Sequence, residues 1–481
     1  MIRDTTIYVF SRALPALLSL SSIALLTHFL SPEEFGRYSL AITLAGFLNV
    51  LLMTWNLQAF YRLHSIYRGR RAAVLDGATS AGFVVSVVTG TVLVGLALPF
   101  FATDFGWDYC LGALALFPAL AALELNSFRL NVGGLPWKYF TLQLARAAGN
   151  LLAGGLVAYL TGSVALVLVA VAIWWLVAAS LSGMARWITL VRFRGEHIQT
   201  MRRMLRYGAP LTAAAALYSG VSMMERFMLD RMAGPEAVGQ LAAGTDIVQF
   251  SVGAIGSAIA LSAYPRLMAL YSRNGGQLKE ELTSYSSYQM AIVLPLVVGL
   301  VLVARPFSEL LIGRDIRDGA AAVMPWAAAG ILFSVLKGFY LDFSFQLTRW
   351  TMGTVIVAAI MILTVFVLNL VLIPLNGAVG TAQASLAGFV VAVLLTYVLG
   401  RLKALPMPFN IADLAKIGLA AAVMAGAVQV TSFSPPMATL IAKSVVGAVV
   451  YAGVLLILNP FHLRGIGRRF LNRVTGRQNY A

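Results

Sequence analysis

The stretches LSPEEFGRYSL, at residues 30–40, and AGPEAVGQLAA, at residues 233–243, carry the same short pattern twice. Pro32, Glu33 and Gly36 match Pro235, Glu236 and Gly239, each pair 203 residues apart. Proline suits the first turn of a helix, whose N–H groups lack intrahelical partners, and glutamate there favours the helix dipole. Glycine allows a close approach of two backbones. Since each stretch separates two long apolar runs, the pattern predicts a tight cap between two helices. This cap occurs twice in the chain.

The composition around these caps is that of a membrane protein. The 481 residues have a mean hydropathy of +0.83, with 59% hydrophobic and 11% charged residues. Soluble domains have about 45–50% apolar and about 25% charged residues. The apolar runs repeatedly exceed the roughly 18–20 residues that span a bilayer as a helix. The first run, residues 7–30, is too long for a signal-peptide core, so we expect it to remain as a helix.

Apolar runs between helix breakers predict an all-α, polytopic chain of fourteen transmembrane helices. The breakers include Pro32, the glycine pair at 133–134, the Gly234-Pro235 pair and the Asn376-Gly377 pair. The predicted spans are 7–30, 38–60, 78–101, 109–126, 141–160, 163–190, 208–232, 237–270, 288–306, 322–345, 351–373, 378–400, 413–432 and 437–458.

Arginine and lysine predict the orientation of these spans. With the N-terminus in the cytoplasm, the cytoplasmic segments hold 22 arginines and lysines and the opposite face holds 5. Such a bias sets membrane topology, so both termini are predicted to be cytoplasmic. The basic tail after Pro460 can touch anionic lipid heads. The basic residues lie in scattered short loops, so no nucleic-acid partner is expected.

The two caps also predict how the spans are grouped. Six helices separate the caps, and since six is even, the copies share one orientation and the repeat is parallel. Parallel repeats related by an axis along the membrane normal recur in secondary transporters. The predicted units are a six-helix bundle at 1–206, a second at 207–403, helices 13 and 14 at 404–458 and a basic cytoplasmic tail at 459–481.

Four stretches give the chain a family resemblance: HFLSPEEFGRYSLA at 28–41, MRRMLRYGAPL at 201–211, ERFMLDRMAGPEAVGQLAAGTDI at 225–247 and LVLIPLNGAVGTAQASL at 370–386. With them the chain resembles the multidrug/oligosaccharidyl-lipid/polysaccharide exporter superfamily, and within it the Wzx-type O-antigen and exopolysaccharide flippases. The resemblance implies two six-helix bundles forming a V-shaped cavity that opens alternately to either side of the bacterial inner membrane.

The resemblance also implies a substrate and partners. Proteins of this kind move undecaprenyl-diphosphate-linked oligosaccharides between leaflets by alternating access. The expected partners are this lipid-linked oligosaccharide, membrane lipids, and the polymerase and glycosyltransferases of the same pathway. A lipid II flippase and a multidrug cation antiporter of the same superfamily remain as alternatives. An antiporter predicts an acidic cavity, whereas the spans of the first bundle offer Arg12 and Arg146 against Glu124.

Charged residues inside the spans are the candidate substrate contacts. A charge at mid-bilayer costs roughly 2.5–3.5 kcal/mol, so it usually faces a cavity or a partner. We expect Arg12, Arg146, Arg226 and Lys337 to line one water-filled, net basic cavity that binds pyrophosphate or acidic sugars. Arginine suits this role because its planar fork binds two phosphate oxygens. Arg226 could instead pair with Asp230 along one helix, and Arg12 and Arg146 could extend to the headgroups.

The remaining chemistry is sparse. Glu225, Asp246 and Asp342 are candidates for ion or proton coupling. The single cysteine, Cys110, and the lack of Cys/His metal spacing predict neither a disulfide nor a metal site. No GxxxxGK[ST] motif is present, and no cofactor is expected. The longest outer loop, residues 305–321, is too short to hold an acceptor site, so the chain is not expected to be an enzyme.

Overall fold

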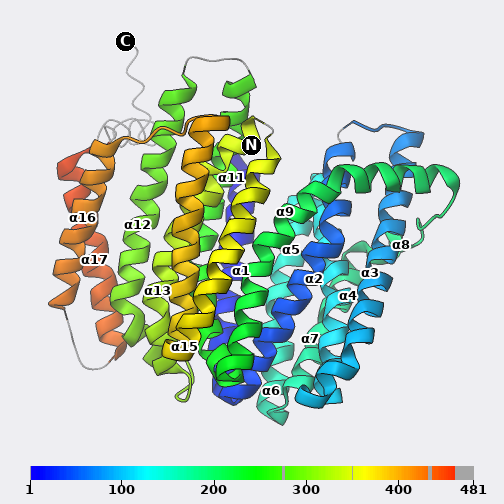
Figure 1. The fold of residues 1–481 in the computed structure, drawn as a ribbon, viewed down its shortest axis with the longest axis horizontal. Coiled ribbons are helices and arrows are strands. Elements are labelled where there is room, and N and C mark those ends of the chain that lie inside the picture. The colour runs from blue at the N-terminus through cyan, green and yellow to red at the C-terminus, as the bar shows by residue number, and fades with distance from the viewer. Residues whose placement is uncertain (1, 65, 273–276, 349, 432–435, 461–481) are drawn as a thin grey trace.

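A computed structural model of the chain describes residues 2–64, 66–272, 277–348, 350–431 and 436–460. Within these ranges the side chains of 2–13, 97–105, 185, 261, 262, 265, 272 and 351 are outside the description. The described residues form helices and connecting loops, with no strand among them (Figure 1). This agrees with the all-α class predicted from the sequence.

The spans of the first predicted bundle are α1 (Ile2–Phe29), α2 (Pro32–His64), α3 (Arg70–Phe105), α4 (Trp107–Val132), α5–η1–α6 (Pro136–Ala148, Gly149–Gly154, Gly155–Thr161) and α7–η2–α8 (Val164–Ala179, Ser180–Met184, Ala185–Ile188), where η marks a π-helical turn. Those of the second are α9 (Gly195–Ala233), α10–η3–α11 (Pro235–Val248, Gln249–Gly253, Ala254–Ser272), α12 (Leu278–Leu311), α13–η4–α14 (Arg317–Leu336, Lys337–Leu341, Phe343–Leu347) and α15 (Thr351–Lys403). The trailing pair is α16 (Ile411–Gln429) and α17 (Pro436–Leu458).

These helices fall on the predicted spans. The long helix α15 covers two of them. Within it, Gly377 has a φ of 53° and breaks the helical path between the two spans. Only glycine adopts this left-handed region at little cost. Among the described residues, nine helical segments are long and apolar enough to cross a membrane by themselves. The chain is therefore a multi-pass membrane protein, and its helices are consistent with fourteen crossings.

Several helices begin before their predicted spans, among them α12, which begins at Leu278 and not at residue 288. The helix α3 begins at Arg70 and not at residue 78, and α9 begins at Gly195 and not at residue 208. The apolar windows miss the first turns of these helices, which carry charged residues such as Arg70, Arg71 and Glu196. In Figure 1 the first turns of α9 lie across the top of the α2–α8 half. The predicted boundary between 206 and 207 thus falls inside a continuous helix.

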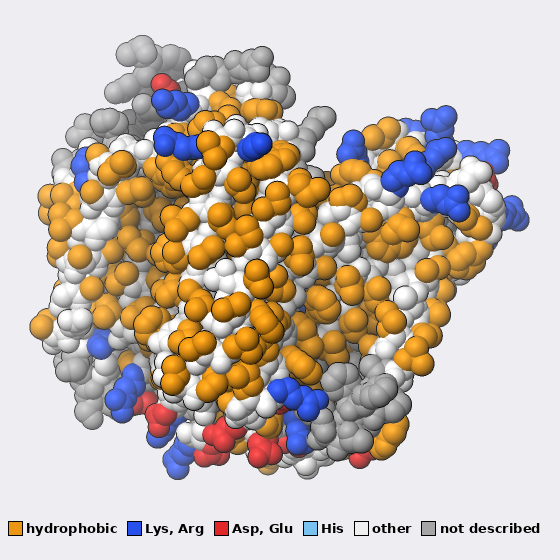
Figure 2. Space-filling model, in the orientation of Figure 1, with side chains coloured by type: hydrophobic (Ala, Val, Ile, Leu, Met, Phe, Trp, Pro, Cys, Tyr) orange, Lys and Arg blue, Asp and Glu red, His pale blue; other side chains and the backbone are white. Residues whose placement is uncertain are grey.

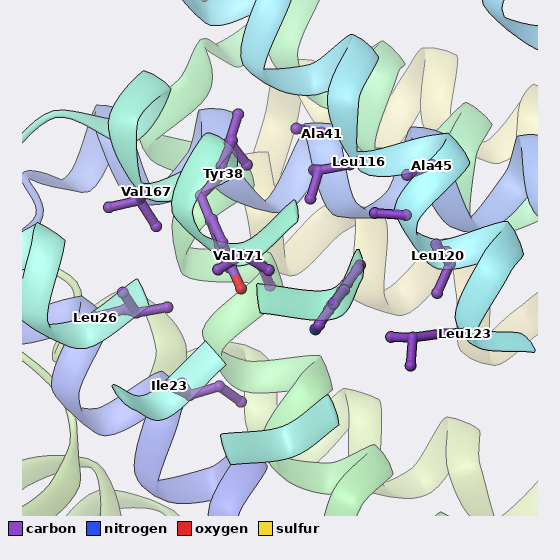
Figure 3. Close-up of a cluster of buried hydrophobic side chains, with 14 of the residues drawn as sticks. Ile23, Leu26, Tyr38, Ala41, Ala45, Leu116, Leu120, Leu123, Val167 and Val171 are labelled. Atoms are coloured by element: carbon purple, nitrogen blue, oxygen red, sulfur yellow. The ribbon is translucent and has the colours of Figure 1, made fainter. Parts of the chain in front are cut away.

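The interior of the first half, which is formed by helices α1–α8 of the first predicted bundle, contains small and branched side chains. The second half is formed by α9–α15. Ile23 and Leu26 of α1 lie beside residues of α2, α4 and α7, among them Ala41, Leu116 and Val167 (Figure 3). All five are buried. Because lipid tails are as apolar as leucine, close van der Waals packing drives the association of such helices. The same buried cluster continues into the second half, through residues such as Ile247 and Val293.

The two halves meet at the cap end, and at the opposite end the start of α9 still packs on the first half. At the cap end, defined by residues 30–36 and 233–239, a methyl group on Gly36 would overlap the carbonyl oxygen of Pro235. A methyl group on Gly239 would lie 2.8 Å from the carbonyl oxygen of Pro32. The repeated caps therefore pack backbone against backbone. At the opposite, arginine-rich end, Figure 2 shows a notch between the halves and a group of basic side chains over one of them.

Candidate functional site

Arg226 on α9 contacts the first half and α10 at the same time. Its Nη1 donates to the Thr43 Oγ1 atom at 2.7 Å and to the hydroxyl of Ser39, both on α2. Its Nη2 donates to Asp246 Oδ1 of α10 at 2.8 Å. The guanidinium fork thus engages three side chains from two other helices. The geometry is that of a contact holding the halves together.

The partner of Arg226 differs from the one that its helix offers. The i, i+4 spacing to Asp230 allowed a pair along α9, but the ion pair runs to Asp246. The Arg226 side chain is 12% exposed and that of Asp246 is 33% exposed. Asp246 therefore offers the more accessible face of this pair, and a ligand reaching Arg226 must compete with a carboxylate already in place.

Lys337 lies in a buried ion pair within the second half. It occupies the first position of the π-helical turn η4, and its Nζ lies 2.8 Å from Asp342 Oδ2 and 3.1 Å from Oδ1. The Lys337 residue is 1% exposed. The same Nζ lies 5.5 Å from the ring centre of Tyr218 on α9, whose hydroxyl contacts Ser334 at 2.8 Å. In this conformation Lys337 touches protein atoms and no open space.

Arg146 belongs to the first half. It forms an ion pair with Glu124 of α4 and lies 5.8 Å from the ring centre of Trp175. The two side chains are 36% and 23% exposed, so the pair is reachable from outside the helix packing. Arg12 lies in the part of α1 whose side chains are outside the described residues, so its contacts stay a prediction.

Of the three acids predicted for coupling, Asp246 and Asp342 form ion pairs, whereas Glu225 forms none with the residues that the structure describes. Glu225 is buried at 8% exposure and accepts a hydrogen bond from Ser385 of α15. Asp246 and Asp342 are held by Arg226 and Lys337. The carboxylate of Glu225 therefore contacts a neutral hydroxyl, whereas those of Asp246 and Asp342 are paired with basic side chains.

The described basic residues of the predicted site are thus each matched by a carboxylate. Arg146, Arg226 and Lys337 pair with Glu124, Asp246 and Asp342. Sequence reasoning considered a carboxylate partner for Arg226 in Asp230, and it missed the three pairs that the structure forms. It also missed Ser39 and Thr43, whose i, i+4 spacing just after the first cap places both hydroxyls on one face of α2.

A long apolar groove lies where α1 meets the second half and the trailing pair. Its volume is about 1080 Å³. Its lining includes Leu17 of α1, Phe250 of η3, Leu296 of α12 and Tyr451 of α17. The charged side chain in its lining is Lys443, whose Nζ donates to the carbonyl of Leu302 at 3.4 Å. In the sequence, this groove is indicated by the apolar trailing pair, which follows the two predicted six-helix bundles.

Comparison with known proteins places these features in a family. Residues 25–318 match the family model described as "Polysaccharide biosynthesis protein". No match was found among curated protein sequences.

Solved structures share the fold over nearly the whole chain. A structure described as lipid II flippase MurJ in an inward closed conformation aligns with a TM-score of 0.77 at 16% identity, covering 95% of this chain and 99% of the other. An inward-facing multidrug resistance MATE family transporter of the MOP superfamily aligns with a TM-score of 0.63 at 14% identity, covering 85% and 99%. A MOP superfamily transporter from Pyrococcus furiosus aligns with a TM-score of 0.55 at 15% identity, covering 84% and 94%. At these identities the likeness concerns the fold.

Proposed function

Because the chain belongs to the family of polysaccharide biosynthesis proteins, within a fold shared by flippases and transporters, we propose that it is a flippase for lipid-linked oligosaccharides. Its substrate is an undecaprenyl-diphosphate-linked repeat unit for a surface polysaccharide such as O-antigen or exopolysaccharide. It moves this unit from the cytoplasmic to the periplasmic leaflet of the bacterial inner membrane. Both chain termini lie in the cytoplasm, as the charge bias predicts.

The apolar groove is the observation that carries this proposal. It runs at the junction of α1, α12 and the trailing pair, so a hydrocarbon chain in it lies beside the line along which the halves separate. Moving such a chain from lipid into the groove gains little hydrophobic free energy, because both surroundings are apolar. The groove therefore orients the tail, and binding energy must come from contacts with the polar head.

The head contacts belong to the four basic residues predicted from the sequence. Arg226 is the central one, since its fork already holds oxygen atoms of three side chains and could hold two phosphate oxygens in the same way. Arg146 and Arg12 meet the head earlier, nearer the arginine-rich end. Lys337 contributes only after its pair with Asp342 opens. In each described case the diphosphate replaces a carboxylate.

Alternating access follows from the two ends of the molecule. In this conformation the caps are in contact and the notch lies at the arginine-rich end, which is the cytoplasmic end in the proposed topology. Opening to the periplasm requires the caps to part and the Arg226 contacts to α2 to break. Protonation or ion binding at Asp246 would release Arg226 and so couple this step to an ion gradient, while Glu225 and Asp342 would act through contacts within the second half.

A reconstituted flippase assay tests the function. Purified protein in liposomes should transfer undecaprenyl-diphosphate-linked oligosaccharide between leaflets, measured by the access of an added glycosidase to the sugar. Lipid II and a cationic dye serve as competing substrates. Faster transfer of lipid II would assign the chain to peptidoglycan synthesis, as the fold shared with MurJ allows. Ion-coupled export of the dye alone would make it an antiporter.

A groove-filling variant tests the tail site. Gly299 of α12 lines the groove, and a side chain added there meets no atom within 4 Å. Gly299→Phe should therefore fold normally and slow transfer about tenfold or more, because the ring occupies space that the tail needs. Gly453→Phe on α17, which also meets no atom within 4 Å but lies outside the groove lining, is the matched control. Equal rates for Gly299→Phe and wild type would remove the groove from the mechanism.

A further inference from the structure

A polar pocket of about 520 Å³ lies at the arginine-rich end, away from the groove and the paired charges. Its lining comes from two segments far apart in sequence. Tyr67, Arg70, Arg71 and Val74 come from the α2–α3 turn and the start of α3, and Glu196, Gln199, Thr200 and Arg203 come from the first turns of α9. Figure 2 shows basic side chains gathered on this part of the molecule.

The charges of this pocket are unbalanced. Arg70 and Glu196 form an ion pair across it, with Arg70 Nη2 at 3.3 Å from Glu196 Oε2. Arg71 and Arg203 face the same space, and neither has a carboxylate partner among the residues that the structure describes. Three arginines against one glutamate leave two uncompensated positive charges. This differs from the membrane interior, where each described basic residue of the predicted site is matched by an acid.

The donors of the pocket are suited to a phosphate group. Two guanidinium forks can each supply parallel N–H bonds to phosphate oxygens. The Gln199 side chain and the Tyr67 hydroxyl add neutral donors in the same lining, whereas the Thr200 hydroxyl donates to the carbonyl of Glu196. We propose that this pocket binds a phosphate group, and that the phosphate is the headgroup of an anionic phospholipid in the leaflet that surrounds it.

The lipid source follows from where the pocket lies. The first turns of α9 run across the end of the first half before the helix turns into the bundle, as Figure 1 shows. In the proposed topology the pocket therefore lies at the cytoplasmic headgroups, at the end of the molecule with the excess of arginine and lysine. Anionic leaflets attract such basic segments by about 1 kcal/mol per residue near the surface.

A lipid held here would do a structural task distinct from transport. One wall of the pocket belongs to the α2–α3 turn and the start of α3 in the first half, and the other to α9, the first helix of the second half. A bound phosphate would therefore fasten the start of α9 onto the first half. None of the groups proposed to contact the transported head lines this pocket, so the inference stands independently of the proposed substrate.

The test measures how tightly the full chain, held in phosphatidylcholine nanodiscs, binds an anionic phospholipid. Native mass spectrometry measures the retained phosphatidylglycerol for wild type, Arg71→Gln/Arg203→Gln and the control Arg194→Gln/Arg202→Gln. All four arginines are exposed, and both variants remove two charges. The pocket variant should bind phosphatidylglycerol about tenfold more weakly or worse, since charge-assisted hydrogen bonds are lost. The control should remain close to wild type, because its arginines lie outside the pocket lining.

Two outcomes overturn the inference. Equal weakening in both variants would mean a diffuse attraction of the basic surface and no pocket. Binding of inorganic phosphate with the same dependence on Arg71 and Arg203, without retention of phosphatidylglycerol, would assign the pocket to a free anion and exclude the lipid.

Glu196→Gln gives a test of opposite sign. It removes the one acid of the pocket and frees Arg70, so phosphatidylglycerol should bind more tightly than to wild type. Weaker binding in this variant would show that the Arg70–Glu196 pair holds the walls in place and that the free arginines do not form the site by themselves.

Discussion

At the scale of single residues, the buried pair of Lys337 and Asp342 has the largest energetic consequences. Both side chains are almost out of contact with the surroundings, at 2% and 12% exposure. Breaking such a pair by removing one partner leaves a buried charge uncompensated, whereas replacing both by apolar groups is often nearly neutral. The pair is therefore a weak source of stability and a strong constraint on which single changes the fold accepts.

The first prediction separates these two roles of Lys337. Lys337→Met should lower the free energy of unfolding by about 3–5 kcal/mol, because Asp342 remains charged and unpaired. Lys337→Met/Asp342→Leu should recover most of that loss in a thermal melt. If Lys337 also contacts the substrate, transfer of the lipid-linked sugar stays low in the double variant. Wild-type transfer by a stable double variant would make the pair purely structural.

The second prediction concerns Arg226. Arg226→Lys keeps the positive charge beside Asp246 but cannot hold the Ser39 and Thr43 hydroxyls with the same fork. Transfer should fall about tenfold or more, the effect of losing about 1.5 kcal/mol in one charged hydrogen bond. Arg305→Lys is the control, since its pair with Glu309 is at the surface and 82% of the arginine side chain is exposed. Unchanged transfer in Arg226→Lys would show that charge alone suffices.

At the scale of elements, apolar windows predicted the existence of the spans well and their ends poorly. The polar first turns of α3 and α9 carry no hydropathy signal, so thirteen residues of α9 were left out of its predicted span. The four π-helical turns, which fall inside spans 5, 6, 8 and 10, were also missed, since a 3.6-residue pattern gives no sign of one extra residue in a turn. One of them places Lys337 opposite Asp342, so the charge pairing could not be read from spacing.

The third prediction tests the cap contact. Gly36→Val should prevent the cap end from closing, because its first side-chain atom would overlap the carbonyl of Pro235. Spin labels at the equivalent exposed positions Glu33 and Glu236 should then report a longer distance than in wild type. Gly46→Val on the same helix, where an added side chain meets nothing within 4 Å, is the control. An unchanged distance in Gly36→Val would mean that the caps do not set the closure.

At the scale of the whole molecule, composition and charge bias indicated the class of protein, and the family comparison agrees with the resemblance seen in the sequence. The pairing of acids with bases and the groove depended on tertiary packing. Both involve residues from helices that are distant in sequence, and hydropathy does not tell which faces will meet. The grouping into two bundles and a trailing pair remains a prediction that rests on the repeat.

The fourth prediction tests the topology. Fourteen crossings place both ends of the chain on one side of the membrane. An alkaline phosphatase fused after Arg477 should be inactive because it stays in the cytoplasm, and one fused after Arg314 should be active. A fusion after Arg477 that is active in the periplasm would require an odd number of crossings. It would place the chain after the trailing pair in the periplasm.

The cap contact has one more consequence, which concerns ancestry. Gly36 lies against Pro235, and Gly239 lies against Pro32, so each cap presents its glycine to the proline of the other. Reciprocal contacts of this kind define an isologous interface, in which one surface recognises a copy of itself. A six-helix ancestor with a single cap could have formed a closed homodimer through it. Fusion of two such genes would then have preserved an existing interface and freed each copy to acquire different charges.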